Sequence, residues 1–205
     1  MIKADAADAE SIWIDLNNNQ KYDEGEEAKV NTDRADEYSK TGATVTIYGA
    51  VRELTVNLQA LSSLVVSGNE KLQVLNCYKN KLTSLDLSKN KELTHLTCRN
   101  NQLTRLDLTA NGKLQSLDCA GNNLADLKLN PSAPLQKVNL SSNQFIGWSA
   151  AGYAQLEEVA CFGNFISSEK MTTLIQSLPV RTAENPGSLY MVDTEEFPNG
   201  RYSAD

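Results

Sequence analysis

Apolar positions recur with a fixed period along the middle of the chain. Leu72, Leu93, Leu114 and Leu135 lie 21 residues apart, and the segments that they bound read LQVLNCYKNKLTSLDLSKNKE, LTHLTCRNNQLTRLDLTANGK and LQSLDCAGNNLADLKLNPSAP. The complete series of start positions is Val51, Leu72, Leu93, Leu114, Leu135 and Leu156. A repeat of this length cannot bury its apolar face alone, so neighbouring repeats must stack into one continuous core.

The fourth, sixth and eleventh positions of each repeat are apolar. The fourth holds Leu54, Leu75, Leu96, Leu117, Val138 and Val159; the sixth holds Val56, Cys77, Cys98, Cys119, Leu140 and Cys161; the eleventh holds Leu61, Leu82, Leu103, Leu124, Phe145 and Ile166. The alternation around the fourth and sixth positions predicts one short strand per repeat, for example Val74–Tyr78, and a stacked parallel sheet. Because the repeat is short, the opposite side should be extended or 3₁₀ rather than α-helical.

The pattern LxxLxLxxNxL at a period of about 20–29 residues resembles the leucine-rich repeat family. The shorter form LxxLxCxxNxLTxLDLSxN is similar to repeats in surface proteins of Bacteroidetes-type bacteria. The resemblance implies a leucine-rich repeat solenoid of the α/β class, wound as a right-handed superhelix with its parallel sheet on the concave side. It also implies an extracellular or cell-surface protein, because relatives are usually exported.

Amides recur at the ninth position of the repeats, which holds Gln59, Asn80, Asn101, Asn122, Asn143 and Asn164. A second series is formed by Asn69, Asn90 and Asn111. Buried backbone groups must be paired where the chain turns, and inward-pointing amides can pair them. We expect both series to be structural ladders rather than ligands or catalysts.

The segments that flank the repeats are expected to form caps. Residues 1–42 are an N-terminal segment with a short strand at Ser11–Asp15, and residues 43–166 hold five complete repeats and one partial repeat. A strand at Ala43–Tyr48 is expected to be the lid over the first repeat. In the C-terminal cap, residues 167–205, an amphipathic pattern predicts a helix at Ser168–Leu178, and Leu189–Val192 should be the last strand.

An acidic loop follows the first of these strands. Counted from Asp15, oxygen-bearing side chains fall at positions 1, 3, 5, 9 and 12, with Lys21 at position 7, which is the spacing of an EF-hand or dockerin calcium loop. The candidate calcium residues are Asp15, Asn17, Asn19, Lys21, Asp23 and Glu26. Gln20 stands where the turn favours glycine, and the upstream flank is strand-like. The alternative is a solvated turn held by Asx hydrogen bonds, and both interpretations stay open.

The four cysteines share the sixth repeat position, which Val56 and Leu140 fill elsewhere. We interpret them as buried thiols that act as small hydrophobic residues. Adjacent strands lie within nominal reach of a disulfide, but the parallel side chains of a stack would strain its crossed geometry. The sequence contains no CxxC pair, which argues further against a zinc site at these cysteines.

Composition limits the classes of partner. The net charge is −7 and the pI about 4.8, which argues against nucleic acid and against an anionic membrane surface. Apolar residues make up 40% of the chain, but no run approaches the roughly 18–20 that a membrane span needs. The start, MIKADAADAE, lacks the apolar middle of a signal peptide, so the chain is cytoplasmic or trimmed. We expect a monomer that needs no cofactor apart from the calcium left open above.

No catalytic constellation stands out, and we expect a non-enzyme. The single histidine, His95, occupies an outward strand position, and no carboxylate marks it as a base of the Ser-His-Asp kind. A phosphate-binding loop of the GxxxxGK[ST] type is absent. Asp86 and Asp107 are repeat equivalents that should face solvent. An enzyme remains an alternative only if these repeats target a catalytic domain elsewhere in a longer parent chain.

The remaining chemistry lies on the expected concave face, where the third, fifth and seventh positions of each repeat point outward. The candidate ligand-binding residues there are Val74, Tyr78, His95, Arg99, Asp118, Lys137 and Phe162. Tyrosine, arginine and phenylalanine are common anchors of interfaces. The sequence therefore predicts a recognition module that binds a protein or a glycan, and the alternative is a stiff, calcium-tied spacer in a larger surface protein.

Overall fold

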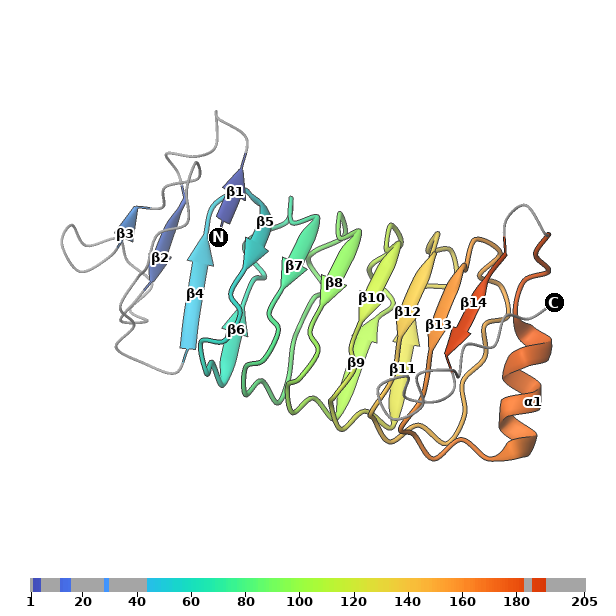
Figure 1. Ribbon diagram of the computed structural model, residues 1–205. Coiled ribbons are helices and arrows are strands. Elements are labelled where there is room, and N and C mark those ends of the chain that lie inside the picture. The colour runs from blue at the N-terminus through green and yellow to red at the C-terminus, as the bar shows by residue number, and fades with distance from the viewer. Residues whose placement is uncertain (1, 5–11, 16–27, 30–43, 183–185, 191–205) are drawn as a thin grey trace.

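The computed structural model describes residues 2–4, 12–15, 28–29, 44–182 and 186–190, and all structural statements below concern these residues. Figure 1 shows an elongated stack of turns with a long sheet along one side and a helix at the C-terminal end. Each turn advances the chain by one 21-residue repeat, because the paired residues of neighbouring repeat strands between residues 51 and 160 lie 21 positions apart, as in Val74 with His95. The stacked architecture predicted from the period is confirmed.

The main sheet forms one side of the solenoid, with strand order β1-β5-β7-β8-β10-β12-β13-β14. The strands are β1 (Ile2–Ala4), β5 (Val51–Thr55), β7 (Val74–Asn76), β8 (His95–Thr97), β10 (Ser116–Asp118), β12 (Lys137–Asn139), β13 (Glu158–Ala160) and β14 (Ser188–Tyr190). All neighbours are parallel except β1, which runs antiparallel to β5. Backbone hydrogen bonds continue the ladder beyond the strand ends, for example from Lys79 N–H to the Arg99 carbonyl at 3.0 Å.

The opposite side of the repeats is extended, as the short repeat length predicts. The strands there are β6 (Ser63–Val65), β9 (Arg105–Leu108) and β11 (Asp126–Leu129). β9 and β11 pair in parallel, and β6 belongs to a second sheet of order β3-β2-β4-β6. The remaining members of that sheet are β2 (Trp13–Asp15), β3 (Ala28–Lys29) and β4 (Thr44–Tyr48).

The N-terminal cap differs from the expected lid. The predicted strand at Ala43–Tyr48 forms as β4, but it pairs in parallel with β6 on the back of the solenoid. The edge of the main sheet next to β5 is covered by β1 instead, where Ile2 is buried. Trp13 of β2 stacks on Tyr48 of β4 with ring centroids 4.3 Å apart. The first turn is therefore closed on both sides by strands that do not belong to the repeats.

The C-terminal end carries the helix and the last strand. Helix α1 spans Ser168–Ser177, and its N-cap Ser167 accepts a hydrogen bond from the Lys170 N–H. Leu174 is the buried residue of the helix. β14 pairs in parallel with β13, which adds one more strand to the main sheet after the last repeat.

A left-handed residue ends the strand segment of every turn. The eighth repeat position has φ between 53° and 64° at Leu58, Lys79, Asn100, Gly121, Ser142 and Gly163. Left-handed backbone costs an L-residue roughly 1–2 kcal/mol, so the four non-glycine turns must be held by the hydrogen bonds around them. At Gly121 a Cβ atom would also lie 2.1 Å from Asn100 Oδ1, so glycine is the residue that fits there without movement.

Candidate functional site

The ninth-position amides hold these turns in place. The Asn122 side chain is buried, and its Nδ2 donates to the carbonyls of Cys98 and Cys119 at 3.1 and 3.0 Å. Its Oδ1 accepts a hydrogen bond from the Leu103 N–H at 3.0 Å. The same pattern recurs at Asn80, Asn101, Asn143 and Asn164. The ladder is structural, and its functional consequence is a rigid backbone beneath the concave face.

Gln59 is the exception to the predicted ladder. Its side chain is exposed and donates to the Asn57 carbonyl at 2.9 Å, rather than pointing inward. The Asn80 Oδ1 accepts the Gln59 and Leu61 N–H groups, each at 3.1 Å, just as Asn101 and Asn122 accept an N–H of the preceding turn. Gln59 belongs to the first repeat, so its side chain has no earlier repeat to join.

The second amide series lies at the opposite corner and also joins neighbouring turns. Asn90 Nδ2 donates to the carbonyls of Val66 and Asn69, at 3.0 and 2.8 Å, and Asn111 Nδ2 donates to those of Leu87 and Asn90. The three side chains are fully buried. The turns that carry both an Asn of this series and a ninth-position Asn are thus fastened to the preceding turn at two corners.

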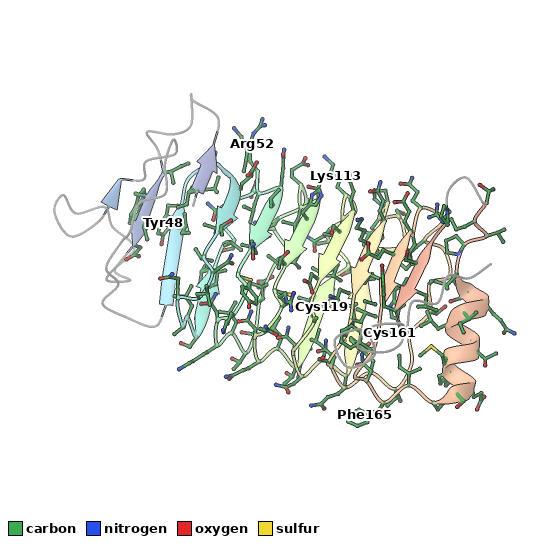
Figure 2. All side chains as sticks on the ribbon, in the orientation of Figure 1. Tyr48, Arg52, Lys113, Cys119, Cys161 and Phe165 are labelled. Atoms are coloured by element: carbon green, nitrogen blue, oxygen red, sulfur yellow. The ribbon has the colours of Figure 1, made fainter. Side chains whose placement is uncertain are left out.

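The four cysteines are free and buried, as the sequence predicts. Figure 2 shows Cys119 and Cys161 inside the stack of turns. Burial raises the pKa of the Cys77 thiol to about 12 and that of Cys161 to about 11, and it raises the pKa values of Cys98 and Cys119 as well. The thiolate, which is the reactive form, is therefore disfavoured at neutral pH.

We expect none of the four cysteines to react with Ellman's reagent at pH 8 in the folded protein, and all four to react in denaturant. The reason is that burial excludes the reagent and keeps each thiol protonated. Since the folded-state pKa values are raised, the associated stability is present below the ordinary pKa of 9.0 and is lost as the pH rises through about 11 to 12. A rapidly labelled cysteine in the folded protein, or a melting temperature lowered by dithiothreitol, would contradict free buried thiols.

The sheet register brings the candidate binding residues together on one face. Val74 and His95 are paired across β7 and β8, and Lys137 of β12 is paired with Glu158 of β13. Val74 is half-buried, whereas His95 and Lys137 are exposed. The first outward column is thus continuous: Glu53, Val74, His95, Ser116, Lys137, Glu158 and Ser188.

Tyr78, Arg99 and Asp118 form one connected group on this face. The Arg99 guanidinium carbon lies 5.5 Å from the centroid of the Tyr78 ring, within the range of a cation–π contact. Arg99 Nη1 also lies 3.9 Å from Asp118 Oδ2. Desolvation raises the pKa of Asp118, although the Ala120 N–H and Arg99 both favour its charged form. The group presents an aromatic ring, a guanidinium and a partly buried carboxylate along three neighbouring strands.

The sequence reasoning missed one residue of this surface. Tyr190 of β14 pairs with Ala160 of β13, so it continues the second outward column beyond the repeats. It is half-buried, like Phe162 in the third column of the preceding strand. Tyr190 does not fall on the 21-residue period of the leucines, and the predicted last strand, Leu189–Val192, was placed only by its composition. The pairing of β14 with β13 joins residues 30 positions apart, so the 21-residue period does not predict it.

The calcium loop lies almost entirely outside the described residues. Asp15 is described, is fully buried at the end of β2 and has an interaction partner. Asn17, Asn19, Lys21, Asp23 and Glu26 are among the residues that the structure does not describe. Within the described residues no group of three His, Cys, Asp or Glu side chains could hold a metal ion.

Asp86 and Asp107 are exposed on the back of the solenoid, as predicted. Asp107 accepts hydrogen bonds from the Thr109 hydroxyl and N–H, at 2.6 and 3.0 Å, and these bonds lower its pKa. Asp86 has an equivalent bond from the Ser88 N–H and a lowered pKa. A carboxylate whose charged form is favoured in this way closes a local turn and is poorly suited to donate a proton.

Thr94 and His95 lie beside each other but do not form a nucleophile and base. The Thr94 hydroxyl donates to the Gln73 carbonyl at 3.0 Å, so its proton is directed to the backbone. His95 Nδ1 lies 2.9 Å from the same oxygen. The hydroxyl oxygen therefore acts as an acceptor toward the histidine, the reverse of the arrangement that activates a nucleophile.

A small cavity of about 240 Å³ lies between the end of the repeats and the C-terminal cap. Its lining includes Leu156, Val159, Leu178 and Leu189, and the Arg181 guanidinium, which donates to the Leu156 carbonyl. The volume is below the range of about 300–1,000 Å³ that is usual for small-molecule sites. This cavity lies between the cap and the last turn, and none of the candidate binding residues of the concave face lines it.

No protein-family model matches this chain, and neither does any curated protein. Among solved structures, the chain is similar to the functional domain of InlJ from Listeria monocytogenes, which includes a cysteine ladder. The identity is 25% over 60% of this chain and 37% of that chain, with a TM-score of 0.37. A leucine-rich repeat protein of Leptospira interrogans is 16% identical over 62% of this chain and 47% of that chain, with a TM-score of 0.35. This chain spans less than half the length of either protein.

The assignment of the fold rests on the molecule itself rather than on these similarities, whose TM-scores are low. The repeat period, the parallel register at 21 residues and the asparagine ladder at the ninth position agree with one another. No described helix is both long and apolar enough to cross a membrane. The chain is a leucine-rich repeat solenoid of short 21-residue repeats.

Proposed function

We propose that this chain is a non-catalytic recognition module of an exported bacterial protein, and that it binds its partner through the concave face of the main sheet. The observation that carries the proposal is the Tyr78–Arg99–Asp118 group, which stands on the rigid backbone of β7, β8 and β10. Aromatic and arginine side chains are the commonest anchors of interfaces.

The contrast between inward and outward positions supports this assignment. The fourth position is buried and aliphatic in every repeat, because stacking requires it. The seventh position changes its chemistry from turn to turn, through Asn57, Tyr78, Arg99, Ala120, Ser141 and Phe162. Stacking of the turns does not require a particular kind of side chain at this outward position. The residues of this column can therefore differ in ways that suit the binding of a ligand.

The size of the face limits the kind of partner. Eight strands at about 4.8 Å spacing span about 34 Å, and three outward residues per strand span about 15 Å. The resulting footprint is on the order of 500 Å², below the roughly 800 Å² that each partner contributes to a standard interface. The face therefore suits a loop, an extended chain or another small ligand.

The direct test is a pull-down from extracellular protein and glycan libraries with the Tyr78→Ala/Arg99→Ala/Phe162→Ala variant. We expect the triple variant to lose the partner that the wild type captures, with at least a tenfold loss of affinity from the removed anchors. The matched control is Arg105→Ala/Phe165→Ala, which removes an exposed arginine and an exposed phenylalanine from elsewhere on the solenoid. Figure 2 shows Phe165 at the edge of the turns, pointing away from them. Equal capture by all three proteins would refute binding through the concave face.

A second proposal concerns calcium in the acidic loop that begins at Asp15. If the loop binds calcium in the folded state alone, EDTA should lower the melting temperature, because such a ligand stabilises the native state by mass action. The expected stabilisation is about 2.7 kcal/mol at a calcium concentration one hundred times the Kd. Thermal melts in EDTA, calcium and magnesium measure it, with Asp23→Asn/Glu26→Gln as the variant that should no longer respond. An identical melt in EDTA and in calcium would leave the solvated turn as the explanation of the loop.

A further inference from the structure

The cavity at the C-terminal end of the solenoid is open to solvent. It measures about 240 Å³ and is lined by residues of β13, β14 and helix α1, which lie together at that end of the stack in Figure 1. Two of its lining side chains are exposed, Ile175 by 43% and Val180 by 99%. The cavity therefore reaches the surface, where a small molecule has access to it.

The inner wall of the cavity is aliphatic. Leu156, Val159 and Leu189 are 2%, 1% and 6% exposed, and Leu178 is half-buried. A cavity of about 150 Å³ lined by aliphatic and aromatic side chains stays dry and binds benzene. The larger volume here has room for an apolar group of that size together with one small polar group.

Arg181 is the one positively charged side chain among the described residues that line the cavity. Its Nη2 donates to the Leu156 carbonyl, and its Nε is enclosed by the protein without a partner. The guanidinium forms no ion pair with a described residue. Nη1 makes no hydrogen bond and is not among the enclosed atoms, so it is a donor that a ligand can reach.

A half-buried guanidinium without a counter-ion favours an anionic ligand. Apolar surroundings disfavour an isolated charge, and a carboxylate offsets that cost through a charge-assisted hydrogen bond. Arg181 is held in place by its bond to the Leu156 carbonyl and by contact with the start of β14, where a Cβ atom at Gly187 would lie 3.4 Å from the Arg181 Cγ. The cation is therefore positioned before a ligand arrives, which lowers the cost of ordering it on binding.

We infer that this cavity binds a small monocarboxylate with an apolar body, such as a short branched-chain acid or an aryl-substituted acid. The carboxylate accepts a hydrogen bond from Arg181 Nη1, and the apolar body packs against Leu156, Val159 and Leu189. None of the concave-face residues takes part. The site is therefore additional to the proposed recognition function and does not depend on it.

Glu157 is the negatively charged residue of the lining. Its carbonyl accepts the Ser188 N–H at 2.7 Å as part of the strand ladder, and its side chain forms no ion pair with Arg181. Because a neighbouring negative charge opposes an anion, Glu157→Gln should bind the acid at least as tightly as the wild type does. Weaker binding by Glu157→Gln would show that the ligand needs this negative charge and would contradict a simple carboxylate.

Ligand-observed NMR titrations at pH 7 with phenylacetate and 4-methylpentanoate test the inference, beside two analogues that each lack one half of the ligand. Phenylacetamide keeps the ring without the charge, and acetate keeps the charge without the apolar body. We expect at least one acid to bind with a Kd of about 0.1–1 mM, in the range for a ligand of about ten non-hydrogen atoms, and both analogues to bind at least tenfold more weakly. Failure of both acids to bind, or equal affinity for either analogue, overturns the inference.

Arg181→Met tests the contribution of the guanidinium. This variant should bind the acid at least tenfold more weakly than the wild type, and Arg181→Lys should bind it more tightly than Arg181→Met because it keeps a positive charge. The matched control is Arg105→Met, which removes an exposed arginine outside the cavity lining and should bind as the wild type does. Unchanged affinity in Arg181→Met would contradict the assignment of the carboxylate to this residue.

Ile175→Trp tests the cavity without disturbing the Arg181 bond to the Leu156 carbonyl. The larger ring narrows the mouth, so the acid should bind at least tenfold more weakly. Thr173→Trp adds the same ring to an exposed position of α1 outside the lining and should leave the affinity unchanged. Acid binding that survives Ile175→Trp would place the ligand outside the cavity and refute the inference.

The concave-face variant separates this site from the proposed function. Tyr78→Ala/Arg99→Ala/Phe162→Ala leaves every lining residue of the cavity in place, so it should bind the acid as the wild type does. Loss of acid binding in this variant would contradict a separate site. Loss of the captured partner with unchanged acid binding is the result expected if both proposals hold.

Discussion

Replacing Asn122 by alanine is expected to lower the free energy of unfolding by about 2–6 kcal/mol, because it leaves one buried N–H without a partner, at about 1–3 kcal/mol, and removes two further hydrogen bonds, at about 0.5–1.5 kcal/mol each. The N–H is that of Leu103, which donates to the Asn122 Oδ1 at 3.0 Å. The carbonyls of Cys98 and Cys119 lose the Asn122 Nδ2 but keep the amides of Asn101 and Asn143, each at 3.0 Å. Urea denaturation followed by circular dichroism measures the change.

The neighbouring residue supplies the control. Asn123 is exposed, and its backbone N–H donates to the Leu103 carbonyl, so Asn123→Ala keeps that bond and removes only a solvated side chain. We expect Asn123→Ala to change stability by less than about 0.5 kcal/mol. Comparable losses for the two variants would show that the ladder is not what holds the turns.

The second large effect is expected at the centre of the core. Leu96→Ala should lower the free energy of unfolding by about 2–5 kcal/mol, the usual cost of a large-to-small change that leaves a cavity. Leu96 is 1% exposed and pairs in register with Leu75 and Leu117, whose side chains are equally buried. Both neighbours are fixed by their own strands, so the turns cannot collapse into the space.

The same denaturation experiment with Ile146→Ala is the control for this prediction. Ile146 is 71% exposed, so its truncation removes little buried surface and should cost less than about 0.5 kcal/mol. A loss below 1 kcal/mol for Leu96→Ala would mean that neighbouring turns do relax into the cavity, and would contradict the rigid stack.

The repeated part of the fold could be predicted because each repeat position occurs again in every turn, so its apolar or polar character can be read several times. Six leucines or valines at the fourth position set the register, and the structure pairs them as expected, for example Leu117 with Val138. The outward columns follow from the same register. Two ionic contacts also follow it, since Lys137 and Glu158 are 21 residues apart, as are Glu92 and Lys113.

The unrepeated parts could not be predicted in the same way. β1 is three residues long and pairs antiparallel with β5, and nothing in Ile2–Ala4 distinguishes it from irregular chain. β4 has the alternation of a strand, but alternation does not say which side of the solenoid it joins. The left-handed turn at the eighth position was hidden because Leu58, Lys79, Asn100 and Ser142 stand there as well as glycine.

The candidate site was predicted only in outline. The period placed Tyr78, Arg99 and Phe162 on one face, but the contact between Tyr78 and Arg99 depends on side-chain conformation that no pattern specifies. Tyr190 joins the same face beyond the repeats, where no period places it. Patterns locate columns, whereas the shape of a surface arises from the particular side chains in them.

The most direct measurement of the central claim is the affinity of the captured partner for three proteins: the wild type, Tyr78→Ala/Arg99→Ala/Phe162→Ala and Arg105→Ala/Phe165→Ala. All three should show the same melting temperature, because every substituted side chain is at least partly exposed. Recognition through the concave face predicts at least a tenfold higher Kd for the triple variant and an unchanged Kd for the control. A Kd that is the same for the triple variant and the wild type would contradict it and place the binding site elsewhere on the solenoid.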